Sequence, residues 1–193
     1  MKQYDKLIEE IREFTKKNVK QSRFEHSQRV ADMCVVLAKK SGVDTQLAYL
    51  AGIGHDMCKD FSEKKLFELA EKDGNPIIDF ERNKPPLLHG RAAAILMKEK
   101  FGITNKSLLY AVAVHTWGGL EMDELAMCLF LADKIEPGRP QSTDEYRARL
   151  LSMPLKEMFV SVLEENYNYF IDKGYSIYPG TKTVLEYYRN NRN

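Results

Sequence analysis

The chain has 193 residues, of which 44% are hydrophobic and 30% are charged, and its charges nearly cancel to a formal net charge of +1. This composition excludes a disordered or collagen-like chain, and the longest apolar run, residues 125–132, is too short to span a membrane. The length fits a single domain, which we expect over residues 1–193. The near-zero charge argues against nucleic acid or an anionic membrane as a partner, because both select strongly basic surfaces.

Apolar residues recur at helical spacing in every periodic stretch, and no stretch alternates with the period of a strand. Asp44 and Ser62 are suited to helix N-caps, and Gly42 is suited to a C-cap. Residues 75–86 are expected to be irregular, because their three prolines break helices. The sequence thus predicts an all-α bundle of about ten helices, at about residues 4–14, 24–40, 44–53, 62–73, 87–101, 105–115 and 123–134, with two or three beyond 140, one of them over 154–174 and the last after 180.

Cysteine usage and the N-terminal segment bear on the compartment. Cys34, Cys58 and Cys128 are odd in number and scattered, which favours buried hydrophobic residues in a reducing compartment over a disulfide framework. Residues 1–17 carry many charges of both signs, unlike a signal or transit peptide. We therefore expect a cytoplasmic protein.

The chain has four histidines, and each lies on the apolar face of a different predicted helix: His26, His55, His89 and His115. Any one of them alone would fit a histidine packed in a core. Four unpaired imidazoles meeting in one core would be costly, whereas a shared metal ion would satisfy all of them.

Asp133 ends a segment, residues 125–133, that is apolar on every side and therefore buried. A carboxylate there needs a cation or several donors, and a pair with Lys134 or Arg139 is the alternative to a metal ion. Asp56 raises the same question after His55. Imidazoles and carboxylates together suit iron, manganese, zinc or another first-row divalent ion, and the set is too rich in nitrogen for calcium or magnesium.

Five ordered sequence blocks carry a family resemblance. In chain order they read EHSQRV, AGIGHDMCKD, LLHG, AVAVHTWG and LADKIEPGR. They resemble the HD superfamily of metal-dependent phosphohydrolases, and most closely its bacterial YqeK-type branch of symmetrical diadenosine tetraphosphate hydrolases. The later block YSIYPGT is similar to that branch as well, so the resemblance covers nearly the whole chain.

The resemblance implies a metal site with one or two ions. Iron is the expected ion, and manganese, nickel and zinc are alternatives. The positions that match the metal ligands of the family are His26, His55, Asp56 and Asp133. His89 and His115 match a further pair that faces the substrate phosphates or holds a second ion.

The same resemblance implies the residues that meet the nucleotide. Lys59 completes an H-D-x-x-K pattern and matches a lysine that binds phosphate. The expected catalytic residues are Asp56, Lys59, His89 and His115. The expected substrate contacts are His26, Lys59, His89, His115, Thr116, Asp133, Arg139 and, in a closing turn, Ser176, Tyr178 and Thr181.

A bound divalent ion lowers the pKa of its water and polarises a phosphoryl oxygen, and nearby cations offset the growing phosphate charge. The residues alone indicate metal-assisted hydrolysis of a phosphoester or phosphoanhydride. The resemblance implies hydrolysis of diadenosine tetraphosphate to two ADP. The alternatives are an HD-type nucleotide phosphatase or deoxynucleotidase, and a non-catalytic nucleotide-binding regulatory protein. The sequence leaves open whether the protein is a monomer or a homodimer.

Overall fold

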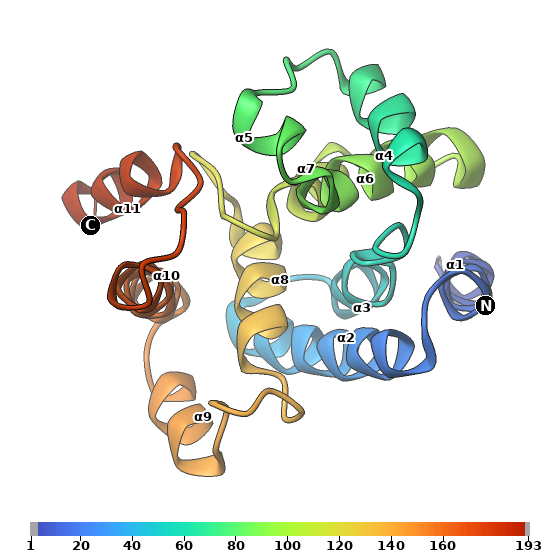
Figure 1. The fold of residues 1–193 in the computed structure, drawn as a ribbon. Coiled ribbons are helices and arrows are strands. Elements are labelled where there is room, and N and C mark those ends of the chain that lie inside the picture. The colour runs from blue at the N-terminus through green and yellow to red at the C-terminus, as the bar shows by residue number, and fades with distance from the viewer. Residues whose placement is uncertain (1–3, 192–193) are drawn as a thin grey trace.

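The computed structural model describes residues 4–191, and these residues form eleven α-helices and two short 3₁₀ helices without a strand (Figure 1). The predicted all-α class is therefore confirmed. In chain order the helices are α1 (Asp5–Asn18), α2 (Gln21–Ser41), α3 (Thr45–Gly54), α4 (Glu63–Ala70), η1 (Glu71–Asp73), α5 (Asp79–Arg82), η2 (Pro85–Leu88), α6 (His89–Phe101), α7 (Lys106–Val114), α8 (Glu124–Ile135), α9 (Asp144–Leu151), α10 (Leu155–Asp172) and α11 (Thr181–Asn190).

The predicted helix boundaries follow from local capping. The Asp44 carboxylate accepts hydrogen bonds from the two backbone N–H groups at the start of α3, and the Ser62 hydroxyl accepts one at the start of α4. Gly42 ends α2 with a φ of 74°, a left-handed conformation that glycine adopts without steric cost. These caps confirm the predicted starts of α3 and α4 and the predicted end of α2. The predictions for two other ends were wrong, because α2 begins at Gln21 and not near residue 24, and α1 continues past residue 14 to Asn18.

Residues 75–86 differ from the irregular stretch that the prolines predicted, because they contain the short helix α5 and the start of η2. The Arg91 guanidinium holds this segment in place. It donates two hydrogen bonds to Asp73, one to Glu81 and two to backbone carbonyl groups of the segment. A long-range contact therefore organises backbone that local sequence signals leave undefined.

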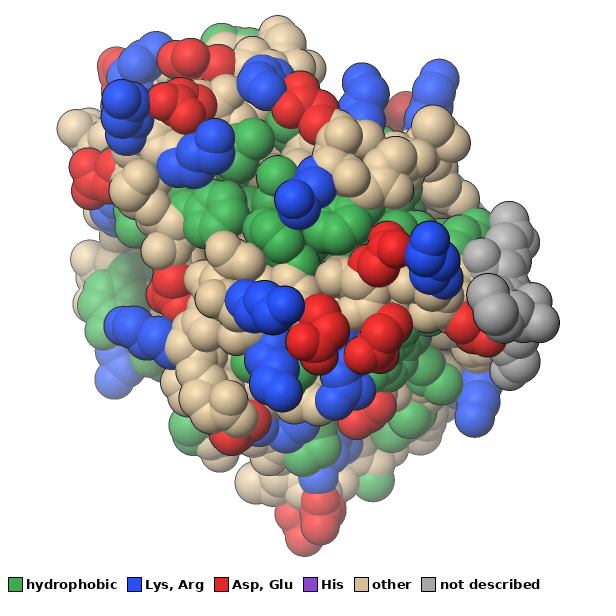
Figure 2. All heavy atoms as spheres, turned by 90° about the vertical axis from the view of Figure 1, so that its right-hand side faces the viewer, with side chains coloured by type: hydrophobic (Ala, Val, Ile, Leu, Met, Phe, Trp, Pro, Cys, Tyr) green, Lys and Arg blue, Asp and Glu red, His purple; other side chains and the backbone are tan. Residues whose placement is uncertain are grey.

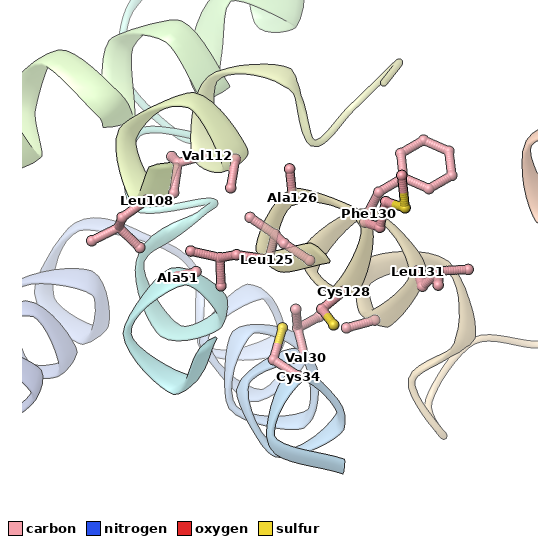
Figure 3. Close-up of a cluster of buried hydrophobic side chains, with 14 of the residues drawn as sticks. Val30, Cys34, Ala51, Leu108, Val112, Leu125, Ala126, Cys128, Phe130 and Leu131 are labelled. Atoms are coloured by element: carbon pink, nitrogen blue, oxygen red, sulfur yellow. The ribbon is translucent and has the colours of Figure 1, made fainter. Parts of the chain in front are cut away.

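The core is built around α8, which runs through the centre of the molecule (Figure 1). All but two of its residues are buried, as expected for a helix that is apolar on every side. Helices α2, α3 and α7 surround one side of it. Figure 3 shows Ala51 and Leu108 near Leu125 of α8, and Val30 of α2 near Cys128 of α8. The three cysteines are buried free thiols, as predicted.

Helices α9, α10 and α11 lie on the other side of α8 (Figure 1). Phe159 of α10 packs against Phe130 of α8 with ring centroids 5.0 Å apart, and against Tyr188 of α11 at 4.9 Å. Among the described residues, no helix is long and apolar enough to cross a membrane. The face drawn in Figure 2 mixes basic and acidic side chains and shows none of the four histidines.

Two glycines bring helices close together beside the histidines. A Cβ on Gly52 of α3 would lie 2.5 Å from the Cα of Ala31 in α2, and a Cβ on Gly90 of α6 would lie 2.9 Å from the carbonyl oxygen of Val112 in α7. Both clashes are with backbone, which cannot rotate away. These two contacts therefore set the separation of the helices that carry the histidines.

We expect Gly52→Ala to destabilise the protein by about 1–3 kcal/mol, because the added methyl group forces α2 and α3 apart. Urea unfolding measures the change, with Lys39→Ala on the exposed side of α2 as the control. An unfolding midpoint equal to that of the wild type would show that the helices can separate freely here.

Candidate metal centre

The four histidines meet in the core from four helices. His26 lies within α2, His55 and His115 directly follow α3 and α7, and His89 is the first residue of α6. All four side chains are buried, with at most 5% of the residue exposed. The expected convergence of these residues is present, and three of them sit at helix ends.

Hydrogen bonds fix the tautomer of three of these rings. His55, His89 and His115 place Nδ1 at 2.7, 2.6 and 2.7 Å from the backbone carbonyl oxygen three residues earlier. A carbonyl oxygen only accepts, so Nδ1 carries the proton and the neutral ring presents the Nε2 lone pair. This arrangement aims three potential ligand atoms at the centre of the cluster.

His26 achieves the same orientation through a carboxylate. Its Nδ1 lies 3.0 Å from Oε1 of Glu136, and Oε2 of the same carboxylate accepts a hydrogen bond from Arg29 Nε at 2.6 Å. Burial raises the pKa of Glu136, but the hydrogen bonds from Arg29, His26 and the Gly138 backbone N–H together outweigh it, and the pKa stays below its usual value. The sequence prediction missed Glu136. The signal that could have identified it is its position three residues after Asp133, in the same sequence block.

Asp56 lies between two pairs of histidines. Its Oδ2 is 3.9 Å from His26 Nε2 and 3.5 Å from His55 Nε2. Its Oδ1 is 3.0 Å from His89 Nε2 and 3.8 Å from His115 Nε2. Each pair forms, with the shared carboxylate, a group of three whose ligand atoms lie within 4.8 Å of one another.

The chemistry of the cluster fits a divalent ion. Nε2 of His55 and Oδ1 of Asp56 are buried and make no hydrogen bond. Nε2 of His89 and Nε2 of His115 lie 3.1 Å apart, and both carry lone pairs in the neutral tautomer set by their Nδ1 bonds. Two lone pairs at this distance repel unless a proton or a cation attracts both. Nitrogen and carboxylate oxygen donors are also the mixed set that first-row divalent metals prefer.

The protonation states suit metal ligands. Burial lowers the pKa of His55 to about 4, and burial followed by the neighbouring His55 and His89 rings lowers that of His115. Burial alone would raise the pKa of Asp56, but the surrounding imidazoles outweigh it and hold the pKa well below its usual value. At neutral pH His55 and His115 are therefore neutral and Asp56 is ionised, the forms that bind metals.

Asp133 both faces the histidines and pairs with cations. Its Oδ1 lies 3.0 Å from His26 Nε2, 3.8 Å from His55 Nε2 and 2.6 Å from Arg139 Nη2. Its Oδ2 accepts a hydrogen bond from Lys134 Nζ at 2.9 Å. The pairs with Lys134 and Arg139 that the sequence offered as an alternative are therefore present, and the same carboxylate also faces the histidine cluster.

Lys59 places its ammonium group at the edge of the cluster, 3.3 Å from each ring nitrogen of His89. Burial lowers the pKa of Lys59, and the charge of Asp56 opposes this effect. The cation thus lies beside the second histidine pair, where a phosphate group close to the cluster would meet it.

Arg23 is a further residue that the sequence prediction missed. Its Nη1 donates to Asp56 Oδ2 at 2.9 Å. The signal is its place one helical turn before His26, on the same face of α2. With Arg29, Arg139 and His26, it lines a small opening of about 190 Å³.

A larger pocket, of about 550 Å³, adjoins the cluster. Thr116 and Lys134 form the junction, because Thr116 Oγ1 lies 3.4 Å from His115 Nε2 and Lys134 Nζ donates to the His115 carbonyl at 2.8 Å. The pocket is mostly apolar and aromatic, and its lining includes Trp117, Phe130, Tyr167, Phe170, Tyr175, Ser176 and Thr181. We call it the aromatic pocket.

Only part of the expected closing turn, which contains Ser176, Tyr178 and Thr181, lines the aromatic pocket. Ser176 and Thr181 line it, whereas Tyr178 lines a neighbouring cavity of about 410 Å³. The Tyr178 ring stacks on Trp117, with centroids 5.7 Å apart and planes inclined by 16°. Tyr178 therefore supports a wall of the pocket from behind.

Comparison with known proteins agrees with this geometry. The HD domain family matches residues 23–138, a range that contains all four histidines and both aspartates of the cluster. The chain belongs to the HD-domain family. Helices α2 to α8 carry the HD domain of this chain, and α9 to α11 follow it.

Several relatives of this HD protein are similar over most of their length. The symmetrical bis(5'-nucleosyl)-tetraphosphatase of Staphylococcus aureus is 29% identical over 94% of each chain, and that of Halalkalibacterium halodurans is 31% identical over 88% of this chain and 90% of the relative. A crystal structure of an HD superfamily hydrolase from Clostridium acetobutylicum, described as involved in NAD metabolism, matches with a TM-score of 0.86 at 29% identity. The match covers 95% of this chain and 97% of that one.

We expect Glu136→Gln to weaken metal binding roughly tenfold, because the neutral amide holds the His26 ring without making it more basic. Competition with a chelator of known affinity measures the binding, and Glu9→Gln on the exposed surface of α1 is the matched control. Equal metal affinity in both variants would show that Glu136 has no influence on the cluster.

Proposed function

We propose that this protein hydrolyses diadenosine tetraphosphate symmetrically to two ADP. The observation that carries the proposal is a buried cluster of four histidines and two aspartates that opens onto an aromatic pocket of nucleoside size. The relatives named as symmetrical tetraphosphatases support the choice of substrate. Free phosphate as a product would instead support the nucleotide phosphatase alternative.

In this proposal the first ion is held by His26, His55, Asp56 and Asp133. A second ion would share Asp56 with His89 and His115. When bound, such an ion activates water and polarises a phosphoryl oxygen. We propose iron as the ion, with manganese, nickel or zinc as alternatives that the same donors accept. The buried free thiols also fit the proposed cytoplasmic location.

Three cations bind and orient the phosphate chain in this proposal. Lys59 stands beside the second histidine pair, and Lys134 and Arg139 flank Asp133. Their charges offset the negative charge that grows on the phosphoryl oxygens during cleavage. The Thr116 hydroxyl, next to His115, is placed to donate a hydrogen bond to a phosphate at the mouth of the pocket.

The aromatic pocket takes one nucleoside. Its volume of about 550 Å³ falls within the usual range of ligand pockets, and aromatic rings from four segments line it, one of them Phe130 of α8. Trp117 comes from the segment after α7, Tyr167 and Phe170 from α10, and Tyr175 from the turn before α11. Ser176 and Thr181 add hydroxyl groups, which suit the polar edges of a base and ribose.

We expect two ADP as the products, because a nucleoside fixed in the aromatic pocket sets the register of the phosphate chain against the metal cluster. Chromatography identifies the products, and hydrolysis in oxygen-18 water should place one label in only one of the two ADP molecules. ATP with AMP as the main products would contradict the proposed register while leaving the metal site unaffected.

We expect Lys59→Ala to lower kcat/KM roughly 100-fold with little change in metal content, because the ammonium group contacts phosphate and does not bind the ion. Kinetics with diadenosine tetraphosphate and metal analysis are measured on the same preparation. Lys64→Ala, on the exposed surface of α4, is the matched control. Loss of metal in Lys59→Ala would assign this residue a structural role.

A further inference from the structure

A second cavity, of about 560 Å³, adjoins the aromatic pocket. It lies between the segment of residues 140–146 and α10, and we call it the outer pocket. The two pockets share three lining residues: Lys134, Asn166 and Phe170. The outer pocket therefore begins where the aromatic pocket meets the metal centre, because Lys134 also contacts Asp133 and the carbonyl group of His115.

Aromatic rings line the outer pocket as well. Tyr169 is 51% exposed and contacts Phe170 and Tyr175 edge to face, with centroids 6.1 and 6.3 Å away. Phe170 in turn contacts Tyr175 at 5.8 Å. The three rings thus form a continuous aromatic ridge from the outer pocket into the aromatic pocket. An exposed tyrosine ring at such a place can stack on a base.

Side chains of α9 and α10 contact each other at the outer pocket. The Tyr146 hydroxyl donates to Oε2 of Glu165 at 2.5 Å, and Arg149 lies 5.1 Å above the Tyr146 ring while donating to Oε1 of the same carboxylate. These contacts join α9 to α10. Tyr146 and Glu165, which both line the outer pocket, thus contact each other across its wall.

We propose that the outer pocket binds the second nucleoside of a dinucleoside polyphosphate. The inference rests on the proposed function, in which the substrate carries two nucleosides and the aromatic pocket takes one. The second must lie within reach of the same phosphate chain, and the shared Lys134 meets this condition. The arginine-lined opening of about 190 Å³ also adjoins the cluster at His26, but it is polar and smaller than usual ligand pockets.

The test compares two substrates that differ in the second nucleoside. Diadenosine tetraphosphate has it, and adenosine 5′-tetraphosphate lacks it. Water cleaves the central phosphoanhydride bond in both cases, which gives two ADP from the first and ADP with pyrophosphate from the second. The quantity measured is the ratio of the two kcat/KM values for each metal-loaded variant. The ratio of each variant is compared with that of the wild type, so the charge difference between the two substrates, which is the same for every variant, cancels.

We expect Tyr169→Ala to lower kcat/KM for diadenosine tetraphosphate roughly tenfold and to leave that for adenosine 5′-tetraphosphate within about twofold, since one stacked base is lost. Tyr169→Phe keeps the ring and should match the wild type with both substrates. Tyr175→Ala is the matched control, because this ring lines only the aromatic pocket and its loss should lower both values equally.

Equal effects of Tyr169→Ala on the two substrates would overturn the proposal, as would no effect on either. A wild-type enzyme that yields no ADP from diadenosine tetraphosphate would instead overturn the proposed function. Calorimetric titration of the metal-loaded wild type with ADP needs no variant. Two ADP per chain would support two nucleoside sites, and one ADP per chain at saturation would contradict them.

Discussion

Mutual repulsion among buried Nε2 lone pairs and carboxylate oxygens is the constraint on which the rest of this structure depends. Each of the four histidines donates its Nδ1 proton in a hydrogen bond, three to backbone carbonyl groups and one to Glu136. The atoms that remain face one another across about 3 to 4 Å. Only positive charge makes such a cluster stable, and the surrounding arginines and lysines provide part of it.

Histidines at helix ends both bond backbone carbonyl groups there and orient their own Nε2 atoms. The last carbonyl groups of a helix have no partner within the helix. His55 and His115 each donate Nδ1–H to such a carbonyl, near the ends of α3 and α7. His89 donates to the Pro86 carbonyl of η2, which also accepts the backbone N–H of His89. The bond completes the helix end and at the same time aims Nε2 into the core. Local helix termination and metal-site geometry thus have a common origin.

The chemistry and the shape of the binding surface come from different parts of the chain. The cluster lies within residues 23–138, the range that matches the HD domain. Much of the wall of both pockets comes from α10 and the turn that follows it, beyond that range. Phe130 and Phe159 join the two parts through the core. This division fits the general rule that specificity is added to a fold by the segments around its reactive centre.

The sequence by itself determined the helical class, the capped ends at Gly42, Asp44 and Ser62, and the set of histidines and aspartates at the centre. These depend on periodicity, on local capping and on the cost of burying polar groups, all of which act within short stretches of chain. Only the tertiary structure decided that Asp56 lies between two histidine pairs and that Glu136 orients His26. It also decided that Tyr178 stacks behind Trp117 and that Phe170 lines both pockets. Those relations join residues far apart in the chain, and they are set by how closely helices pack, as at Gly52 against Ala31, which no local pattern records.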